Sequence, residues 1–162
     1  MDKAELYIGK PNGVVLCVDR RESCGIAGRI YHSYSREAIP FSGMEDVIFQ
    51  LERFFDYLNF PHPTTSNRLF CEGTKQEITR QERIAIMKDE ELLNQHGDLG
   101  TFLVHVQHRQ NSSWQGRITW VDQKKTVYFR SALEMLKLVS DALESVSDDD
   151  TTDPSWQDAP EA

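Results

Sequence analysis

The sequence predicts an α+β protein made of two βββα units, in which largely antiparallel strands pack against two amphipathic helices. Three observations support this prediction. Near each end of the chain, three strand-like runs are followed by one helix-like run. The connections inside each unit span about four to ten residues, which favours antiparallel pairing. Identical residues recur at one fixed spacing between the two units.

The first predicted unit covers residues 13–58. Short apolar, β-branched runs predict strands at 13–18, at 25–34 and around 38–41. A helix is expected over 42–58, because Ser42 and Glu45 have the spacing of a capping box. Its apolar residues recur at helical intervals: Val47, Ile48, Leu51, Phe54, Phe55 and Leu58. The helix should end before Pro61, since proline cannot continue it.

The second predicted unit covers residues 101–144 and has the same order. Strands are expected at 101–107, 114–121 and 126–129, with a tight turn at 122–125 between the last two. A helix over 131–143 follows, with Ser131 and Glu134 as its capping box. The sequence leaves open whether the two units share one sheet or form two.

The two units align at a spacing of 88 residues, almost without gaps. Gly-Arg-Ile stands at 28–30 and again at 116–118. The other identical pairs are Val18 with Val106, Arg21 with Arg109, and Phe41 with Phe129. Together with the matching element order, these identities predict an internal duplication.

The remaining segments complete the predicted organisation. Residues 5–10 are expected to add an N-terminal strand, and 59–100 form a charged helical and loop insert with one or two surface helices within 77–97. Residues 145–162 contain six acids and no Lys or Arg, a composition typical of a disordered tail. Residues 1–144 are therefore expected to form a single globular domain.

Charge and composition restrict the class of protein. The net charge is −8, of which the tail supplies −6, so residues 1–144 carry only −2. No apolar run is long enough to span a membrane, and the N-terminus lacks a secretory signal, which predicts a cytoplasmic protein. In that compartment the sequon at Asn111 is not used, and Cys17, Cys24 and Cys71 are expected to be free thiols.

The sequence offers little catalytic chemistry. It has no serine-hydrolase, P-loop, dinucleotide-binding or zinc-protease signature. His105 and His108 lie in a strand pattern that would point them to opposite faces, so a metal pair is not expected. Cys24, beside Arg20 and Arg21, is the one cysteine whose pKa a neighbour could lower. We expect no enzyme activity, no cofactor and no metal.

The candidate interaction residues belong to the repeated positions and to the stretch RQNSSWQG at 109–116. They are Arg109, Asn111, Ser112, Trp114, Arg117, Trp120, Arg21 and Arg29. Trp114, Gly116, Ile118 and Trp120 share one face of the predicted strand. That face has two interpretations, a core face against the helix or a partly exposed interaction patch. The repeated arginines could bind nucleic acid, although no lysine cluster starts either helix.

The stretch RQNSSWQG, followed by a strand and then FRSALE at 129–134, resembles a pattern in short uncharacterised bacterial proteins of the Firmicutes type. The resemblance is strongest over residues 100–144 and fainter over 30–70. It implies a cytosolic bacterial origin, and it implies no activity or mechanism.

Three functions remain as hypotheses. The first is a non-enzymatic binding or regulatory protein that acts through a protein partner, including self-association as a homodimer. The second is a small inhibitor or antitoxin, of mobile-element origin, that blocks a nucleic-acid-handling enzyme with an acidic surface. The third is an RNA-binding module, suggested by an analogy of topology alone. No membrane partner is expected.

Overall fold

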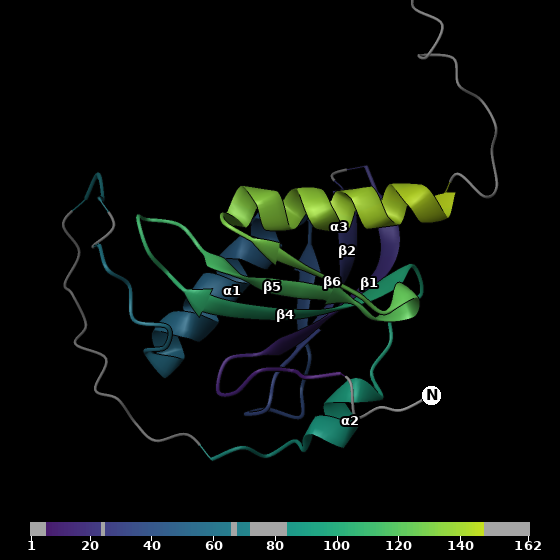
Figure 1. The fold of residues 1–162 in the computed structure, drawn as a ribbon, viewed down its shortest axis with the longest axis horizontal. Coiled ribbons are helices and arrows are strands. Elements are labelled where there is room, and N and C mark those ends of the chain that lie inside the picture. Colours follow the sequence, from purple (N-terminus) through teal and green to yellow (C-terminus); the bar gives the residue numbers. More distant parts are fainter. Residues whose placement is uncertain (1–5, 24, 66–67, 72–83, 148–162) are drawn as a thin grey trace, which may run out of the picture.

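The computed structural model describes residues 6–23, 25–65, 68–71 and 84–147 (Figure 1). Within these residues, six strands form one sheet in the order β3-β2-β1-β4-β5-β6, and every neighbouring pair is antiparallel. The strands are β1 (Val14–Glu22), β2 (Gly25–Tyr31), β3 (Ile39–Ser42), β4 (Gly100–His108), β5 (Gln115–Trp120) and β6 (Lys125–Phe129). The predicted α+β class is therefore confirmed, and the two halves share one sheet.

Each half of the sheet is followed by a long helix. α1 (Met44–Leu58) follows β3, and α3 (Ala132–Ser147) follows β6. The short 3₁₀ helix η2 (Val121–Gln123) makes the turn before β6, and α2 (Asp89–Leu93) lies in the connection between the halves. Among the described residues, no helix is long and apolar enough to cross a membrane.

The hydrogen-bonded registers of the two halves coincide at a spacing of 88 residues. Val18 pairs with Gly28 in the first half, and Val106 pairs with Gly116 in the second. Each of these ladders has an irregularity one residue later, between Val18 and Arg20 and between Val106 and His108. The outer ladders agree as well, since Gly28 pairs with Phe41 and Gly116 with Phe129.

Both repeated glycines are required by a close approach of the neighbouring strand. A Cβ at Gly28 would collide with the backbone carbonyl of Cys17, and a Cβ at Gly116 would collide with that of His105. Glycine is the residue that permits such backbone contact. The glycine of each Gly-Arg-Ile also pairs with the last residue before the irregularity in its ladder.

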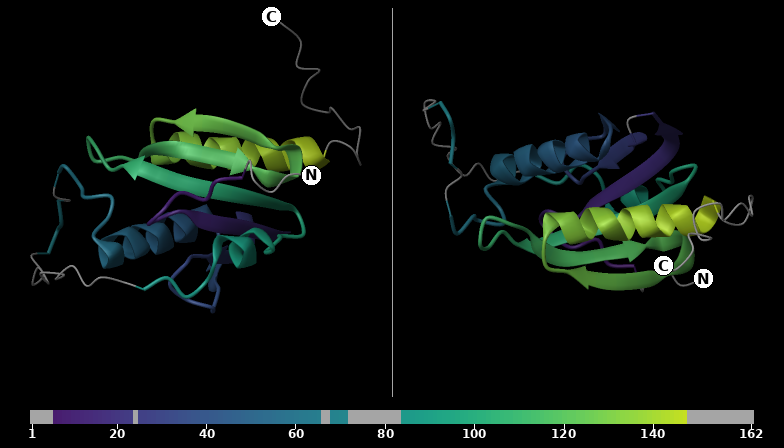
Figure 2. Two further views of the ribbon diagram at one scale, coloured as in Figure 1. Left: turned by 60° about the horizontal axis from the view of Figure 1, so that its bottom comes forward. Right: turned by 90° about the horizontal axis from the view of Figure 1, so that it is seen from above.

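The main hydrophobic core lies between the sheet and the two long helices. Both helices contribute to it together with all six strands, and its most deeply buried side chains come from each half. Seven that are almost completely buried are Leu16, Ile30, Leu51, Phe55, Phe102, Phe129 and Met135. Figure 2 shows α1 and α3 lying alongside one another over their respective halves of the sheet.

A smaller core covers the other face of the sheet. It consists of Ile8, Val15, Cys17, Met87, Leu92 and Leu103. The connection between the halves therefore supplies the cover through Met87 and Leu92, and α2 lies across the sheet from α3 (Figure 1). The N-terminal segment adds Ile8, which is buried although it belongs to no strand.

Several local predictions need correction. Residues 6–10 form no strand; Gly9 has a φ of 90° and accepts a hydrogen bond from Gly13, so the chain turns there instead. Of the expected helices within 77–97, the described part contains only α2, and residues 77–83 lie outside the described part. Residues 68–71, in the same insert, belong to no helix or strand.

The two predicted capping boxes have different outcomes. Ser131 caps α3 as expected, because its hydroxyl accepts a hydrogen bond from the backbone N–H of Glu134 at 3.0 Å. Ser42 does not cap α1: it ends β3, and Gly43 takes the N-cap position. The backbone N–H of Ser42 instead donates to the carboxylate of Asp46. At the other end, Asn59 closes α1 in the left-handed conformation before Pro61.

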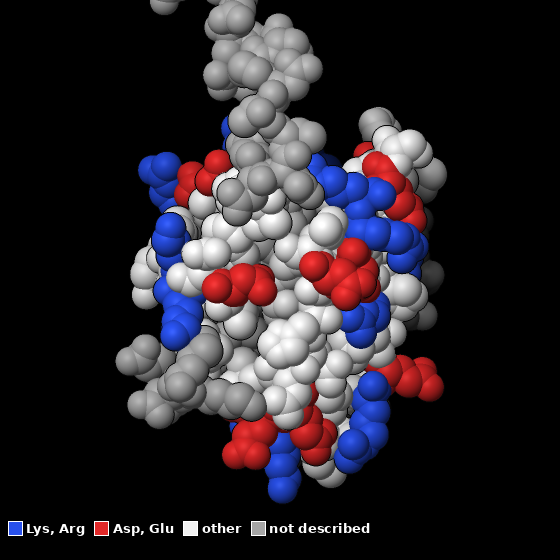
Figure 3. Space-filling view, turned by 90° about the vertical axis from the view of Figure 1, so that its right-hand side faces the viewer, with Lys and Arg blue, Asp and Glu red and all other residues white. Residues whose placement is uncertain are grey.

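Charged side chains of both signs are interspersed on the face drawn in Figure 3. This view looks onto the side of the molecule that lies at the right of Figure 1. The acidic tail predicted at 145–162 needs correction, because residues 145–147 belong to α3; residues 148–162 lie outside the described residues. In the described residues seen here, acids and bases alternate and do not segregate into one basic surface.

Candidate functional site

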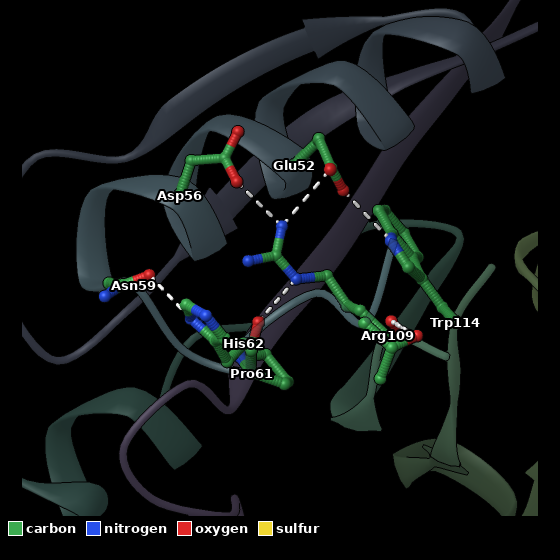
Figure 4. Close-up of polar contacts among 8 residues, drawn as sticks. Glu52, Asp56, Asn59, Pro61, His62, Arg109 and Trp114 are labelled. Carbon is green, nitrogen blue, oxygen red and sulfur yellow. Dashed lines mark hydrogen bonds and ion pairs between the residues drawn. The ribbon is translucent and has the colours of Figure 1, made fainter. Parts of the chain in front are cut away.

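The stretch 109–116 begins with an arginine that joins the end of β4 to α1. The Arg109 guanidinium donates to the carboxylates of Glu52 at 3.1 Å and Asp56 at 2.8 Å, and its Nε donates to the Pro61 carbonyl at 2.6 Å (Figure 4). Arg109 is only 4% exposed and its guanidinium lies over the Phe55 ring. Such a paired, hydrogen-bonded arginine fixes the relative position of the elements it joins.

Trp114 extends the same network at the other end of the loop. Its indole N–H donates to the second carboxylate oxygen of Glu52 at 3.0 Å, so Glu52 bridges Arg109 and Trp114. The Trp114 ring packs edge-on against Phe55, with centroids 5.4 Å apart. The indole is buried, which places it in the core between α1 and the sheet.

The centre of the loop is held by hydroxyl groups. Asn111 and Ser112 both have positive φ values, 54° and 57°, which form the tight bend. The Ser112 hydroxyl lies 2.8 Å from that of Thr65, and the Ser113 hydroxyl accepts from the first backbone N–H of α3, that of Ala132. RQNSSW therefore joins α1, the 63–65 segment and the start of α3.

A surface hollow of about 220 Å³ lies beside this loop. Its apolar wall comes from Ile48, Phe49, Pro63, Trp114 and Ala132, and Glu52 and the hydroxyls of Thr65, Ser112 and Ser113 supply polar groups. Both Glu52 oxygens, however, already accept hydrogen bonds from Arg109 and Trp114. The polar side of the hollow is thus largely committed to internal contacts.

The other predicted arginines also make internal contacts. Arg21, the equivalent of Arg109, donates to the Leu143 carbonyl of α3 at 2.7 Å. Arg29 forms a two-pronged ion pair with Asp19 at 2.9 and 3.1 Å. Arg117 lies over the Tyr7 ring, 4.6 Å from its centroid, and donates to the Tyr7 carbonyl. The structure therefore brings Arg109, Ser112 and Trp114 together and places the other three arginines elsewhere.

Trp120 lines a second hollow, which the sequence predictions did not include. It measures about 140 Å³ and lies between α3 and the outer strands of the second half. Its apolar walls are Phe102, Ile118, Trp120, Val127, Leu138 and Ala142, and Lys125 and Asp141 add polar groups. We call it the α3–β6 groove.

In the first half of the molecule, the residues equivalent to two walls of this groove pack against each other. At a spacing of 88, His32 corresponds to Trp120 and Phe54 to Ala142. The His32 and Phe54 rings stack with centroids 4.3 Å apart and fill the space between α1 and its strands. In the second half the helix carries the methyl group of Ala142 instead, which leaves the groove. The presence of Ala142 where the first half has Phe54 can be read from the sequence when the two helices are aligned at a spacing of 88 residues.

The two edges of the sheet also differ. β3 has four residues and contains Pro40, which has no backbone N–H. β6 has five residues, with Tyr128 at the position equivalent to Pro40. Tyr128 is 68% exposed and Val127 is 44% exposed, so this edge presents apolar side chains on a strand that, among the described residues, pairs only with β5.

Burial favours the neutral forms of His32, His105 and Cys17. Burial lowers the pKa of His32 to about 4 and raises the pKa of the Cys17 thiol to about 11. Burial, followed by the charge of Arg117, also lowers the pKa of His105. A thiol with a raised pKa is a poor nucleophile. Cys71 is exposed, and Cys24 lies outside the described residues.

The described residues contain no group of three or more His, Cys, Asp or Glu side chains that could hold a metal ion. The features that stand out are therefore a braced loop, an open sheet edge and the groove beside it. No protein-family model, curated protein or solved structure matches this chain.

Proposed function

We propose that this protein is a non-enzymatic binding protein that acts through a protein partner, and that the partner adds an extended segment to β6. One observation supports this above the others: within the part of the chain that the structure describes, β6 is an edge strand that pairs only with β5, whereas its counterpart β3 carries Pro40. Edge strands of soluble proteins are usually protected by proline, charge or cover, because their free backbone groups pair with other chains.

Strand addition would use the free backbone groups of residues 125–129. Main-chain hydrogen bonds give such complexes their affinity, and the alternating side chains give them their specificity. The exposed rings and methyl groups of Tyr128 and Val127 would be covered in the process. The remainder of the fold is compatible with this role, because the Arg109 network links the β4–β5 loop of the second half to α1 of the first.

The two other functional hypotheses have less support. The arginines considered for RNA binding, Arg21, Arg29, Arg109 and Arg117, all donate to groups within the protein. Both signs of charge are mixed on the face in Figure 3, whereas phosphate binding favours a basic surface. An inhibitor that acts through acidic mimicry would depend mainly on residues 148–162, which lie outside the described residues.

We infer further that the two halves arose by duplication of a βββα unit. Two ladders of the first half share their registers with two of the second at a spacing of 88 residues, including the irregularity at which each central strand bends. If the two halves had arisen independently, each would have had to acquire the same strand register, the same irregularity and a glycine at the same position. A later divergence of the two copies explains why one edge and one groove remain open.

The proposed function is tested by making β6 resemble β3. Tyr128→Pro removes one backbone N–H at a position where the equivalent Pro40 remains paired with β2, so pairing with β5 should survive. Random peptides displayed on phage would be selected on the unmodified protein. We expect the selected peptides to slow amide hydrogen exchange in residues 125–129 and to lose binding to Tyr128→Pro.

Tyr128→Thr is the matched control, because it removes the same ring but keeps the backbone N–H. It should retain most of the binding, and the thermal unfolding of both variants verifies that they are folded. Selected peptides that bind Tyr128→Pro as tightly as the unmodified protein would refute strand addition at β6. Failure to select any peptide would also count against it.

A further inference from the structure

We propose that the α3–β6 groove binds one aromatic side chain of the segment added to β6, and that cations at the rim select a segment with acidic residues. This inference rests on the proposed function and specifies the chemistry of the partner. The occupant is an extended, acidic segment of a different protein.

The shape of the groove supports an aromatic ring. In the first half of the molecule, the equivalent space is filled by the Phe54 ring, which stacks on His32. In the second half, Ala142 leaves a hollow of about 140 Å³ with Trp120, Phe102 and Leu138 among its walls. A cavity of about 150 Å³ with apolar walls accommodates a benzene ring. The fold thus already contains, in its other half, the packing that we expect of the bound ring.

The groove and the strand edge can be used by one segment at the same time. Side chains of an added strand alternate between the two faces of the sheet. Val127 and Lys125 both line the groove, so they lie on the face that α3 covers. Residues of an added strand that stand opposite them point to that same face, with Cβ atoms about 5 Å away. One of these residues can therefore reach the groove while the backbone pairs with β6.

The charges along β6 favour an acidic partner. Lys124 and Lys125 begin the strand, and neither has an ion-pair partner within the part of the chain that the structure describes. Arg130 follows the strand and is paired with Glu134 at 3.2 Å. One acid, Asp141, also lines the groove. Asp122 precedes these residues, and residues 123–133, which include β6, contain three cations and no acid.

The same charges disfavour a second copy of this chain. Antiparallel pairing of two β6 strands about Val127 would place Lys124 of each copy opposite Arg130 of the other. Like charges directly opposite one another in a sheet are destabilising. An acidic segment from another protein would instead gain an attractive contact at one or both ends.

The test uses synthetic peptides of one design. The probe is a nine-residue peptide of alternating Thr and Val with a central Phe and two Glu at each end. One variant replaces Phe with Ala, and another replaces the four Glu with Lys. Isothermal titration calorimetry measures their affinities for the full chain. We expect the Phe-to-Ala and Glu-to-Lys changes each to weaken binding about tenfold or more, with the charge effect shrinking as salt rises.

Two protein variants locate the effect. Ala142→Phe should fill the groove as Phe54 does in the first half, and should abolish the preference for Phe over Ala while leaving weaker binding. Lys125→Glu, at an exposed residue, should reduce or reverse the preference for the acidic peptide without disturbing the core. If Ala142→Phe does not fold, the indole N–H signal of Trp120 in NMR spectra reports groove occupation directly and should shift with the Phe peptide alone.

The outcomes separate this inference from the proposed function. Equal binding of the Phe and Ala peptides, still abolished by Tyr128→Pro, would overturn the groove as an anchor site while strand addition stands. Binding that persists in Tyr128→Pro would overturn strand addition instead. A chain truncated after Ser147 that binds the probe more tightly would identify residues 148–162 as the occupant. A dimer in sedimentation experiments that the probe dissociates would identify a second copy. Either result would overturn the proposal that the bound segment belongs to a different protein.

Discussion

The Arg109 network gives a sharp test of how the second half is braced. Arg109→Met keeps a long, buried side chain but removes two ion pairs and the hydrogen bond to the Pro61 carbonyl. Deleting one partner of a buried ion pair typically costs about 3–5 kcal/mol. Here the carboxylates that remain, those of Glu52 and Asp56, are 30% and 49% exposed, so water can hydrate them and reduce the loss.

A second feature reduces the expected loss further. One guanidinium nitrogen, Nη2 of Arg109, is buried and has no hydrogen-bond partner in the described part of the protein. An unsatisfied buried donor costs about 1–3 kcal/mol, and the substitution removes that cost. We therefore expect Arg109→Met to lower the free energy of unfolding by about 2 kcal/mol, which corresponds to a fall in Tm of about 4–8 °C.

Arg21→Met is the matched control, because Arg21 stands at the equivalent position of the first half. It is exposed and donates to a backbone carbonyl, that of Leu143, so the expected loss is about 1 kcal/mol or less. Urea unfolding followed by circular dichroism measures both losses. The reasoning is refuted if Arg109→Met costs no more than Arg21→Met, because burial and ion pairing would then contribute nothing extra.

Three further predictions concern the first half. Gly28→Ala should destabilise the protein by several kcal/mol in urea unfolding, because its Cβ would collide with the Cys17 carbonyl; a loss below about 1 kcal/mol would contradict the close approach. Cys17 should resist iodoacetamide at pH 8 while Cys71 reacts, as mapped by mass spectrometry, since burial raises the pKa of the Cys17 thiol to about 11. His32 has a pKa lowered to about 4 by burial, so the unfolded chain takes up a proton first as pH falls from about 6.5. Stability should thus decline between about pH 6.5 and 4, and His32→Phe, which preserves stacking on Phe54, should reduce this decline; an unchanged pH profile would exclude His32 as its source.

Much of the fold could be predicted from the sequence because the pattern is local. The strands and both long helices lie within a few residues of their predicted positions, since alternation and helical spacing of apolar residues depend on which face is buried. The same reasoning failed at residues 6–10, where an apolar run covers the second face without joining the sheet. It also failed at Ser42, because β3 extends to that residue and leaves Gly43 to begin the helix.

The candidate site was predicted only in part. The stretch RQNSSWQG was expected to follow the strand at 101–107 and to supply four candidate interaction residues: Arg109, Asn111, Ser112 and Trp114. Its spacing could not show that Glu52, 57 residues away from Arg109, accepts from that arginine and, through its other oxygen, from Trp114. Ion pairs between distant segments depend on how helices pack over the sheet, and local pattern does not encode that geometry.

The sequence by itself determined the order of elements, the two-unit pattern and the spacing of 88 residues, because each of these follows from periodicity along the chain. The tertiary structure decided that the halves share one sheet with β1 and β4 at its centre and with β3 and β6 at its edges. It also decided that the repeated arginines brace the fold, and that β6 and its groove remain open. Those outcomes depend on which strands become neighbours and which positions face one another across the core. A free edge and an unfilled space exist only once the whole sheet is assembled.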